Sequence, residues 1–339
     1  MNKTALIAGI SGQDGAYLAS FLIKKGYNVL GGVHRTGNES LWRLDKLGIT
    51  DNIEFVNFDL TKLKDIEATL ENYEIDELYN LAAESSVNSS FNQPLITSEI
   101  TGLGVTRILT SIRRIRPSIK FYQASSSEMF GNSKDSPVNE NSNFHPRSPY
   151  GISKLYAYWI TINHRESYDI FACNGILFNH ESPLRPKEFV TRKITSGVAK
   201  YENGFRDPIE LGNLSVKRDW GFAGDYVPGM WKILQADEPD DYILASGENH
   251  SVREFVEESF SCIGVKVRWD GEGLKEKGFC SESGDLLVII NPKYYRPSEI
   301  ISLLGDYSKA KRILDWSPKT SFRNLVEMMV KSDLTLLRS

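Results

Sequence analysis

This chain has few of the features that mark disulfide-bonded, metal-binding, membrane-spanning or nucleic-acid-binding proteins. Its three cysteines, Cys173, Cys262 and Cys280, are odd in number and far apart, so they predict neither a disulfide framework nor a zinc site. No run of 18 apolar residues is present, and the amino-terminal apolar stretch is too short for a signal peptide. With 40 basic against 44 acidic residues, the chain lacks the basic excess that nucleic-acid binding requires. We therefore expect a cytoplasmic protein that binds neither membranes nor nucleic acid.

What is present is the composition of an ordinary globular protein. Hydrophobic residues make up 40% of the 339 positions and charged residues 25%, which is enough to build a sizeable core. A chain of this length is typical of one large domain or two closely associated ones.

The first half of the chain alternates short apolar runs with amphipathic stretches. We expect strands at residues 4–8, 28–34, 53–59, 77–83 and 120–126. Helices are expected between them, one ending at Gly26 and others at residues 42–47, 63–73 and 100–115. This alternation predicts an α/β fold with a Rossmann-type doubly wound parallel sheet.

The regular alternation ends near residue 180. Short expected strands at residues 209–212, 242–245 and 286–290 are mixed with short helices, proline and glycine. We therefore expect a dinucleotide-binding domain over residues 1–180 and a smaller, irregular substrate-binding domain over residues 181–339. No linker rich in glycine, serine or proline separates them, so we expect the two domains to interlace.

Three glycines lie between the first strand and the first helix. Gly9, Gly12 and Gly15 have the spacing Gly-x-x-Gly-x-x-Gly, which permits a tight turn and lets backbone N–H groups approach a pyrophosphate. A tight turn without a ligand is the alternative, but the position after an amino-terminal strand favours a dinucleotide. Arg35 follows the second strand with no acid before Glu39, which favours NADP over NAD unless Arg35 is only a solvated charge.

A tyrosine and a lysine are spaced for chemistry on one helix face. Tyr150 and Lys154 are four residues apart, so the ammonium group can lie near the phenol. A nearby cation lowers the pKa of a tyrosine from about 10 and makes the phenolate a usable base. A surface tyrosine–lysine pair is the alternative, and the Ser125–Ser127 run at the end of the fifth strand argues against it.

Together these motifs resemble the extended short-chain dehydrogenase/reductase family of sugar-nucleotide epimerases, dehydratases and reductases. Residues 126–131, SSEMFG, are similar to the Thr-Ser-Glu-x-Tyr/Phe-Gly signature of the GDP-mannose 4,6-dehydratases. The dTDP-glucose 4,6-dehydratases instead have an acidic residue where this chain has Ser127. The resemblance covers essentially the whole chain and is densest at residues 124–131, 145–161, 173–183, 189–195, 217–227 and 294–300.

The resemblance implies a reaction and four catalytic residues. Tyr150 would take the proton of the sugar 4-hydroxyl while the C4 hydride passes to NADP, with Lys154 beside it. Glu128 would then remove the C5 proton and assist loss of the C6 hydroxyl as water, before the hydride returns to C6. Ser126 would hydrogen-bond the sugar O4, in the place of the family's threonine. The product would be GDP-4-dehydro-6-deoxy-D-mannose.

The remaining expected site residues follow from strand ends and from the resemblance. The cofactor-binding set is Gly9, Gly12, Gln13, Asp14, Gly15, Arg35, Asp59, Leu60, Leu81, Ala82, Ala83, Ser85, Lys154, His180 and Arg185. The substrate-binding set for a GDP-sugar is Ser85, Ser126, Glu128, Tyr150, Asn179, Lys193, Arg218, Arg296 and Glu299. Each single arginine could also be a solvated charge, and we expect Trp220 and Trp231 to be core residues.

Residues 36–42 resemble a loop that in relatives reaches a neighbouring subunit, although Thr36 stands where relatives often have a second arginine. With candidate dimer helices at residues 100–115 and 155–167, we expect a dimer or tetramer.

Three alternatives to a GDP-mannose enzyme remain. A GDP-manno-heptose 4,6-dehydratase would use the same chemistry, whereas Glu128 argues against an epimerase or reductase. A regulatory protein without catalysis should lack Tyr150, Lys154 or Glu128, and all three are present.

Overall fold

The computed structural model describes residues 2–34, 40–295 and 298–338, and its centre is a seven-stranded sheet. Its strands, in spatial order, are β11 (Asp241–Leu244), β6 (Ala172–Leu177), β5 (Lys120–Ser126), β4 (Glu77–Asn80), β1 (Thr4–Ala8), β2 (Asn28–Val33) and β3 (Ile53–Asn57). All neighbouring pairs are parallel. The chain runs outward from β1 to β3 and then in the other direction from β4, so the switch point lies between β1 and β4. The predicted doubly wound sheet is confirmed.

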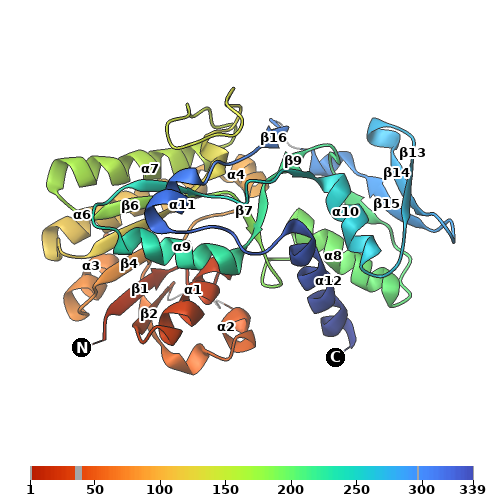
Figure 1. Ribbon diagram of the computed structural model, residues 1–339. Helices are drawn as coiled ribbons and strands as arrows, with labels where there is room; N and C mark the ends of the chain where they lie inside the picture. Colours follow the sequence, from red (N-terminus) through yellow and green to blue (C-terminus); the bar gives the residue numbers. More distant parts are fainter. Residues whose placement is uncertain (1, 35–39, 296–297, 339) are drawn as a thin grey trace.

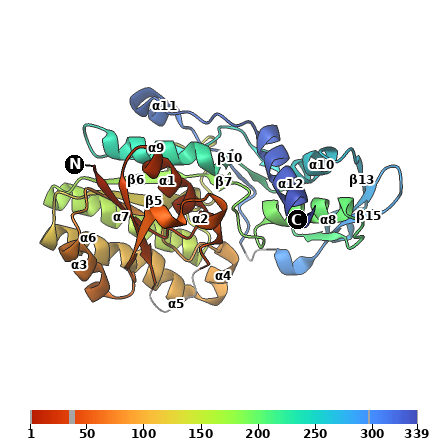
Figure 2. The same cartoon turned by 90° about the horizontal axis from the view of Figure 1, so that it is seen from below.

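Helices cover both faces of this sheet (Figures 1 and 2). One face packs against α1 (Gln13–Lys24) and α9 (Ala223–Gln235), and their apolar residues join one buried cluster with the strands. The other face carries α3 (Leu63–Asn72), α6 (Gly104–Ile115) and α7 (Pro149–Tyr168), which contribute to a second buried cluster. The short helix α2 (Trp42–Lys46) follows the described end of β2.

The helix expected at residues 100–115 begins differently from the prediction. Its first turns form a π-helix, η2 (Ser98–Leu103), which continues α5 (Pro94–Thr97) and leads into α6 at Gly104. Gly104 has little room for a side chain, because a Cβ there would lie 3.0 Å from the Leu60 Cβ. The wide π turn and this glycine bring the helix close to the end of the third strand.

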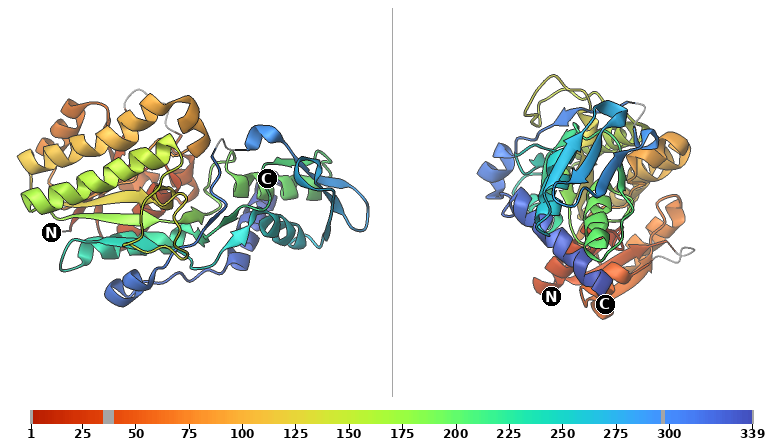
Figure 3. Two further views of the ribbon diagram at one scale, coloured as in Figure 1. Left: turned by 90° about the horizontal axis from the view of Figure 1, so that it is seen from above. Right: turned by 90° about the vertical axis from the view of Figure 1, so that its right-hand side faces the viewer.

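A second group of elements lies beside the main sheet (Figures 1 and 3). It contains α8 (Val190–Glu202), α10 (Val252–Ser261), α12 (Phe322–Arg338) and a four-stranded sheet. That sheet has the order β13 (Val267–Asp270), β14 (Lys277–Cys280), β15 (Leu286–Ile290) and β8 (Ile209–Leu211). Trp220 is buried in its core against Phe255 and Phe322, as expected.

The strand expected at residues 242–245 belongs to the main sheet and not to the smaller domain. β11 pairs in parallel with β6, and α9 makes the crossover that precedes it. All four residues of β11 are buried, as is typical of a parallel strand covered on both faces. The chain therefore returns to the first group of elements after it has entered the second, and a cut at residue 180 does not separate the two groups.

Two small sheets lie between the groups. One pairs β7 (Asn179–Glu181) with β10 (Trp220–Phe222), and the other has the order β12 (His250–Ser251), β9 (Lys217–Arg218) and β16 (Ser302–Leu303). The remaining short elements are η1 (Thr50–Asn52), α4 (Val87–Asn92), η3 (Ser127–Met129), η4 (Gly273–Lys275), η5 (Pro292–Tyr294) and α11 (Ser308–Leu314). Within the described ranges, no helix combines the length and apolarity that crossing a membrane would need.

Candidate active site and dinucleotide pocket

The glycine motif forms the tight turn that leads from β1 into α1. Gly9 has a φ of +81°, and a Cβ there would lie 2.8 Å from the Ala82 backbone nitrogen. A Cβ on Gly15 would lie 2.3 Å from the Gly9 carbonyl oxygen. Larger residues at these positions would push the turn away from β4, so the glycines allow the helix amino terminus to face the sheet edge.

A cavity of about 520 Å³ opens in front of this turn, within the usual range for ligand sites. Twelve of the expected cofactor residues line it: Gly9, Gly12, Gln13, Asp14, Gly15, Asp59, Leu60, Leu81, Ala82, Ala83, Ser85 and Arg185. Arg35, the residue expected to choose NADP, lies outside the described residues. Lys154 and His180 are not among the described residues that line the cavity.

Sequence reasoning missed several residues of this cavity, and Arg43 is the most informative of them. The others are Ser11, Gly32, His34, Phe58, Thr61, Ile100, Pro186 and Phe189. Arg43, on α2, donates to the carbonyl oxygens of Leu184 at 2.8 Å and Ser11 at 3.1 Å. It therefore ties the glycine turn to Leu184, which lies 141 residues after Arg43 in sequence, and no local pattern could have shown this.

Asp59 forms an ionised corner of the cavity after β3. Its carboxylate accepts hydrogen bonds from the backbone nitrogen and hydroxyl of Thr61, at 2.9 and 2.7 Å. Lys62 and His34 approach it at 3.1 and 2.8 Å. Burial by itself raises the pKa of Asp59, but the Thr61 hydrogen bonds and the two neighbouring bases outweigh burial and hold the pKa below its ordinary value.

The expected reacting groups meet where β5 ends and α7 begins. Ser126 is the last residue of β5, and its hydroxyl accepts a hydrogen bond from the Glu128 backbone nitrogen at 3.2 Å. A Cβ on Gly151 would lie 2.9 Å from the Glu128 carbonyl oxygen, so this glycine lets α7 approach the turn. The Tyr150 phenol consequently hydrogen-bonds Ser126 and lies within the field of the Glu128 carboxylate.

Lys154 does not lower the pKa of Tyr150 in this arrangement, so that expectation is wrong. The Lys154 ammonium donates to the Ala124 carbonyl oxygen at 2.6 Å and lies 5.8 Å from the centroid of the Tyr150 ring. Burial raises the pKa of Tyr150 to about 12, although the Ser126 hydrogen bond opposes this. Burial also lowers the pKa of Lys154 to about 8. Desolvation is the largest influence on the pKa of each side chain.

His180 contacts Asp14, which follows the glycine turn in the first turn of α1. Its Nε2 lies 2.6 Å from the Asp14 Oδ2, and its Nδ1 lies 2.6 Å from the Phe178 carbonyl oxygen. Arg185 follows His180 by five residues: its Nε is 3.2 Å from Glu181, and its guanidinium stacks on Phe189 at 3.7 Å. The residues that follow β6 therefore form one wall of the turn.

Three of the expected substrate residues, Asn179, Arg218 and Lys193, lie on the small sheets and on α8. Arg218 is buried on β9, where it donates to the Ile300 carbonyl oxygen at 2.7 Å and pairs with Glu299 at 3.2 Å. Lys193 on α8 lies 3.4 Å from the Tyr294 ring centroid, and Asn179 begins β7. The structure thus brings Arg218 and Glu299 together. Arg296 lies outside the described residues.

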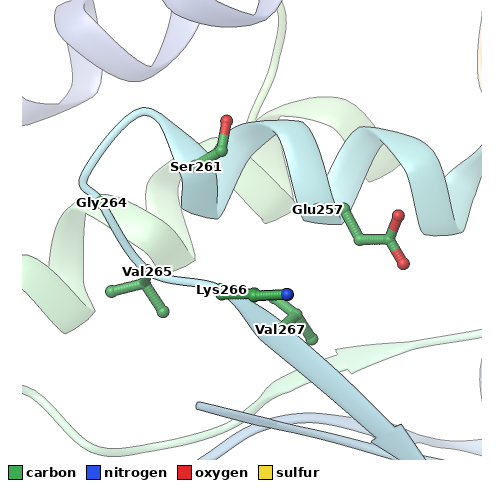
Figure 4. A pocket seen from close by; sticks show the side chains of 6 residues that line it. All are labelled: Glu257, Ser261, Gly264, Val265, Lys266 and Val267. Carbon is green, nitrogen blue, oxygen red and sulfur yellow. The ribbon is translucent and has the colours of Figure 1, made fainter. Parts of the chain in front are cut away.

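Another hollow, of about 500 Å³, lies between α10 and β13 in the second group (Figure 4). Its lining residues are Glu257, Ser261, Gly264, Val265, Lys266 and Val267. None of them belongs to a motif that the sequence analysis identified. We therefore place the chemistry at the glycine turn and the β5–α7 junction.

The fold and these two motifs define an extended short-chain dehydrogenase/reductase. UDP-glucose 4-epimerase from Thermotoga maritima has the same fold, with a TM-score of 0.82, 20% identity and coverage of 98% of this chain and 99% of that one. dTDP-glucose 4,6-dehydratase from Bacillus anthracis in complex with NAD has a TM-score of 0.79 and 18% identity, covering 97% and 96%. RMD from Pseudomonas aeruginosa complexed with NADPH has a TM-score of 0.79 and 20% identity, covering 99% and 100%.

Sequence comparison narrows the class to one family. The family model described as GDP-mannose 4,6 dehydratase matches residues 6–329. The GDP-mannose 4,6 dehydratase of Cricetulus griseus is 48% identical, covering 99% of this chain and 93% of its own length. The Vibrio cholerae enzyme is 43% identical, covering 98% and 94%. The chain belongs to the GDP-mannose 4,6-dehydratase family, whose members are hydro-lyases that act on sugar nucleotides.

Proposed function

We propose that this chain converts GDP-D-mannose to GDP-4-dehydro-6-deoxy-D-mannose and water, with NADP as its cofactor. The observation that carries the proposal is the meeting of Glu128, Ser126 and Tyr150 beside the dinucleotide pocket. A 4,6-dehydratase needs a carboxylate at C5 in addition to the tyrosine at C4, and this junction supplies both. The 43–48% identity to GDP-mannose 4,6-dehydratases over nearly the whole chain supports the same substrate.

The cavity in front of the glycine turn fits a nicotinamide dinucleotide. Gly9 and Gly15 leave no room for a Cβ, so backbone N–H groups at the start of α1, among them that of Gln13, would hold the pyrophosphate. Asp59 and Leu60 would lie at the adenosine end, and residues 81–85 at the nicotinamide ribose, with Lys154 near it. When bound, the nicotinamide would accept a hydride from C4 of the sugar and return it to C6.

The side chains of the junction would move the protons. The Tyr150 oxygen, as the phenolate, takes the C4 hydroxyl proton, while Ser126 holds O4 and Lys154 keeps its hydrogen bond to the Ala124 carbonyl oxygen. The C4 ketone acidifies the C5 hydrogen, which Glu128 accepts as a proton and passes to the C6 hydroxyl as it leaves as water. The proton held by Tyr150 is then available for C5 when the C5–C6 double bond is reduced, so both side chains regain their starting states.

Residues of α8, of the two small sheets and of the segment that precedes β16 would bind the GDP. Lys193, Arg218 and Arg296 would neutralise the diphosphate, since guanidinium and ammonium groups are suited to phosphate oxygens. Asn179 would hydrogen-bond the substrate, and Glu299 would accept from the ribose hydroxyls. The ion pair between the buried Arg218 and Glu299 holds both side chains in fixed positions before binding, which favours this assignment.

We further propose that the protein is a cytoplasmic homodimer or homotetramer. Ile152, Tyr156 and Trp159 recur along one side of α7, and each leaves more than two fifths of its surface exposed. Leu103 of η2 is exposed to a similar extent, so an apolar face continues from α7 to the start of α6. A second copy of the same face would cover it, as expected for a two-fold dimer.

An assay of the purified protein with NADP and GDP-mannose tests the function. We expect a 4-keto, 6-deoxy sugar nucleotide, with no net change in the amount of oxidised cofactor. GDP-manno-heptose as a parallel substrate tests the alternative with a longer C6 side chain. A product that retains its 6-hydroxyl would show an epimerase or reductase and would contradict the proposal.

Cofactor choice is tested by Arg35→Ala. If Arg35 contacts the 2′-phosphate, its loss removes a charge-assisted hydrogen bond of about 1.5–3 kcal/mol, which is roughly tenfold to more than a hundredfold in affinity. Titration calorimetry should show weaker NADP binding with NAD binding almost unchanged. An equal loss for both cofactors would assign Arg35 a structural role, and a wild-type preference for NAD would overturn the choice of NADP.

A further inference from the structure

The Asp14–His180 pair is an ionisable contact at the dinucleotide site to which the proposed reaction gives no role. Asp14 lies in the first turn of α1 and lines the cavity. His180 lies in β7, 166 residues away in sequence, and contacts the Asp14 carboxylate without itself being among the described residues that line the cavity. Gln13 strengthens the contact, because its side-chain nitrogen donates to both the Asp14 carboxylate and the His180 carbonyl at 3.1 Å.

The geometry places the His180 ring between two oxygen atoms, which suits a doubly protonated imidazole beside a carboxylate. The Phe178 carbonyl oxygen can only accept, so the His180 Nδ1 must donate to it across 2.6 Å. The Nε2 faces the Asp14 Oδ2 at the same distance, as in a charge-assisted hydrogen bond. The ring also stacks on Tyr226 with centroids 5.0 Å apart, which fixes its orientation.

The ionisation tendencies of the two groups agree with this geometry. Burial lowers the pKa of His180, but the charge and hydrogen bond of Asp14 outweigh burial and raise the pKa above its ordinary value. Burial raises the pKa of Asp14, but His180 and Gln13 outweigh it and lower the pKa. Both groups are therefore favoured in their charged forms.

An unpaired carboxylate at this position would oppose cofactor binding. The amino terminus of α1 attracts anions through its exposed N–H groups, and a pyrophosphate and the Asp14 carboxylate would share that end. Repulsion between them would be strong in a partly buried site, where water screens poorly. A cation on the far side of Asp14 removes this repulsion without occupying space in the cavity.

We propose that His180 is a positioning residue that acts on the cofactor through Asp14. Its imidazolium cancels the Asp14 charge at the start of α1 and links the glycine turn to residues 178–182, where the chain leaves the main sheet. The inference rests on the proposed dinucleotide pocket. It differs from direct contact, in which His180 itself would touch the cofactor.

A set of four variants tests the charge relation: His180→Gln, Asp14→Asn, the double variant, and His164→Gln. His164 is a matched control because it is also buried with its Nδ1 on a backbone carbonyl, that of Ile160, and within the described residues no ion pair joins its ring to a carboxylate. The NADP dissociation constant is measured by titration calorimetry at a temperature where every variant is folded. Thermal unfolding without nucleotide is recorded in parallel.

We expect His180→Gln to weaken NADP binding about tenfold or more, and Asp14→Asn to leave it equal or tighter. The double variant should recover to within about threefold of wild type, and His164→Gln should not differ from wild type. Raising the salt concentration should reduce the defect of His180→Gln, because it is electrostatic.

A double variant as weak as His180→Gln would show direct contact with the cofactor and overturn the inference. Unchanged NADP affinity in His180→Gln, with only a lower unfolding temperature, would show a structural role and also overturn it. Wild-type protein that binds neither NADP nor NAD would instead contradict the proposed function, so the two failures are distinguishable.

Discussion

At the scale of single residues, the proposed role of Glu128 is what separates a dehydratase from an enzyme that only oxidises or epimerises. Its position depends on its neighbours: Ser126 binds its backbone nitrogen, and the missing side chain of Gly151 lets Tyr150 reach the same turn. A carboxylate and a phenol so placed can act on adjacent carbons of one sugar ring. Removing the charge of Glu128 should therefore stop the proposed reaction after its first step, the oxidation at C4.

Glu128→Gln should permit oxidation at C4 but block elimination. The amide is close in size to the carboxylate but cannot accept the C5 proton, and loss of such a base typically costs about 10²–10⁴-fold in rate. On adding GDP-mannose, the absorbance of reduced nicotinamide should accumulate to about one equivalent of enzyme. Full turnover by this variant would contradict the role of Glu128.

Lys154 leads to a prediction about stability. Its pKa is lowered by burial from 10.5 to about 8, so the folded protein releases a proton that the unfolded chain keeps between these values. The contribution of Lys154 to the free energy of unfolding is therefore lowest below pH 8 and rises until about pH 10.5. The size of the change is about 3 kcal/mol, from roughly 1.4 kcal/mol per pH unit.

Urea unfolding of wild type and Lys154→Met, after removal of bound nucleotide, measures this effect. The difference in their free energies of unfolding should shift in favour of wild type by about 3 kcal/mol between pH 8 and 10.5. A difference that stays constant across this range would mean that Lys154 has an ordinary pKa in the folded protein.

At the scale of elements, the turn between β1 and α1 decides whether the pocket exists. Gly15→Ala would place a Cβ 2.3 Å from the Gly9 carbonyl oxygen and 2.6 Å from the Ile10 Cα, both of which are backbone atoms that cannot easily move. We expect it to destabilise the protein by about 1–3 kcal/mol and to lose measurable dinucleotide binding. Denaturant melts and calorimetric titration with NADP provide the two measurements.

Gly26→Ala, at the other end of the same helix, is the control. Gly26 has a φ of +84°, and a Cβ there would meet no atom within 4 Å among the described residues beyond its chain neighbours, so alanine strains the backbone without a clash. It should cost about 1–2 kcal/mol of stability and leave NADP affinity unchanged. If both variants lost binding equally, global destabilisation and not the turn would be responsible.

At the scale of the whole molecule, the apolar face of α7 and η2 is the surface that a partner would cover. Ile152→Lys would place a charge at the centre of the proposed two-fold contact, where it would meet its own copy. Light scattering at micromolar concentration should show an oligomer for wild type and a smaller species for the variant. Ile313→Lys, on α11 and similarly exposed, should not change the mass. A monomeric wild type would contradict the proposal.

Much of the fold was predictable because it depends on local patterns. The bounds of β1, β5 and β15 agree with the prediction, since short apolar runs bounded by turn residues are typical of buried strands. The glycine turn was predictable because steric limits on φ act within a few residues. The motif residues Tyr150 and Lys154 were predicted on one helix, where helical spacing places them on one face.

Other features depend on where distant segments pack. The sequence around residues 241–244 predicts a strand, but only the return of α9 to the main sheet decides that it pairs with β6. Arg43 and His180 reach the glycine turn from 32 and 166 residues away.

The sequence by itself determined the first five strands with most of the helices between them, the turn that forms the pocket and the candidate reacting groups. The tertiary structure decided which carboxylate His180 meets and in which direction burial moves the pKa values of Tyr150 and Lys154. The physical reason is that backbone sterics and periodicity act between near neighbours, whereas desolvation and charge pairing depend on every group that the fold brings close.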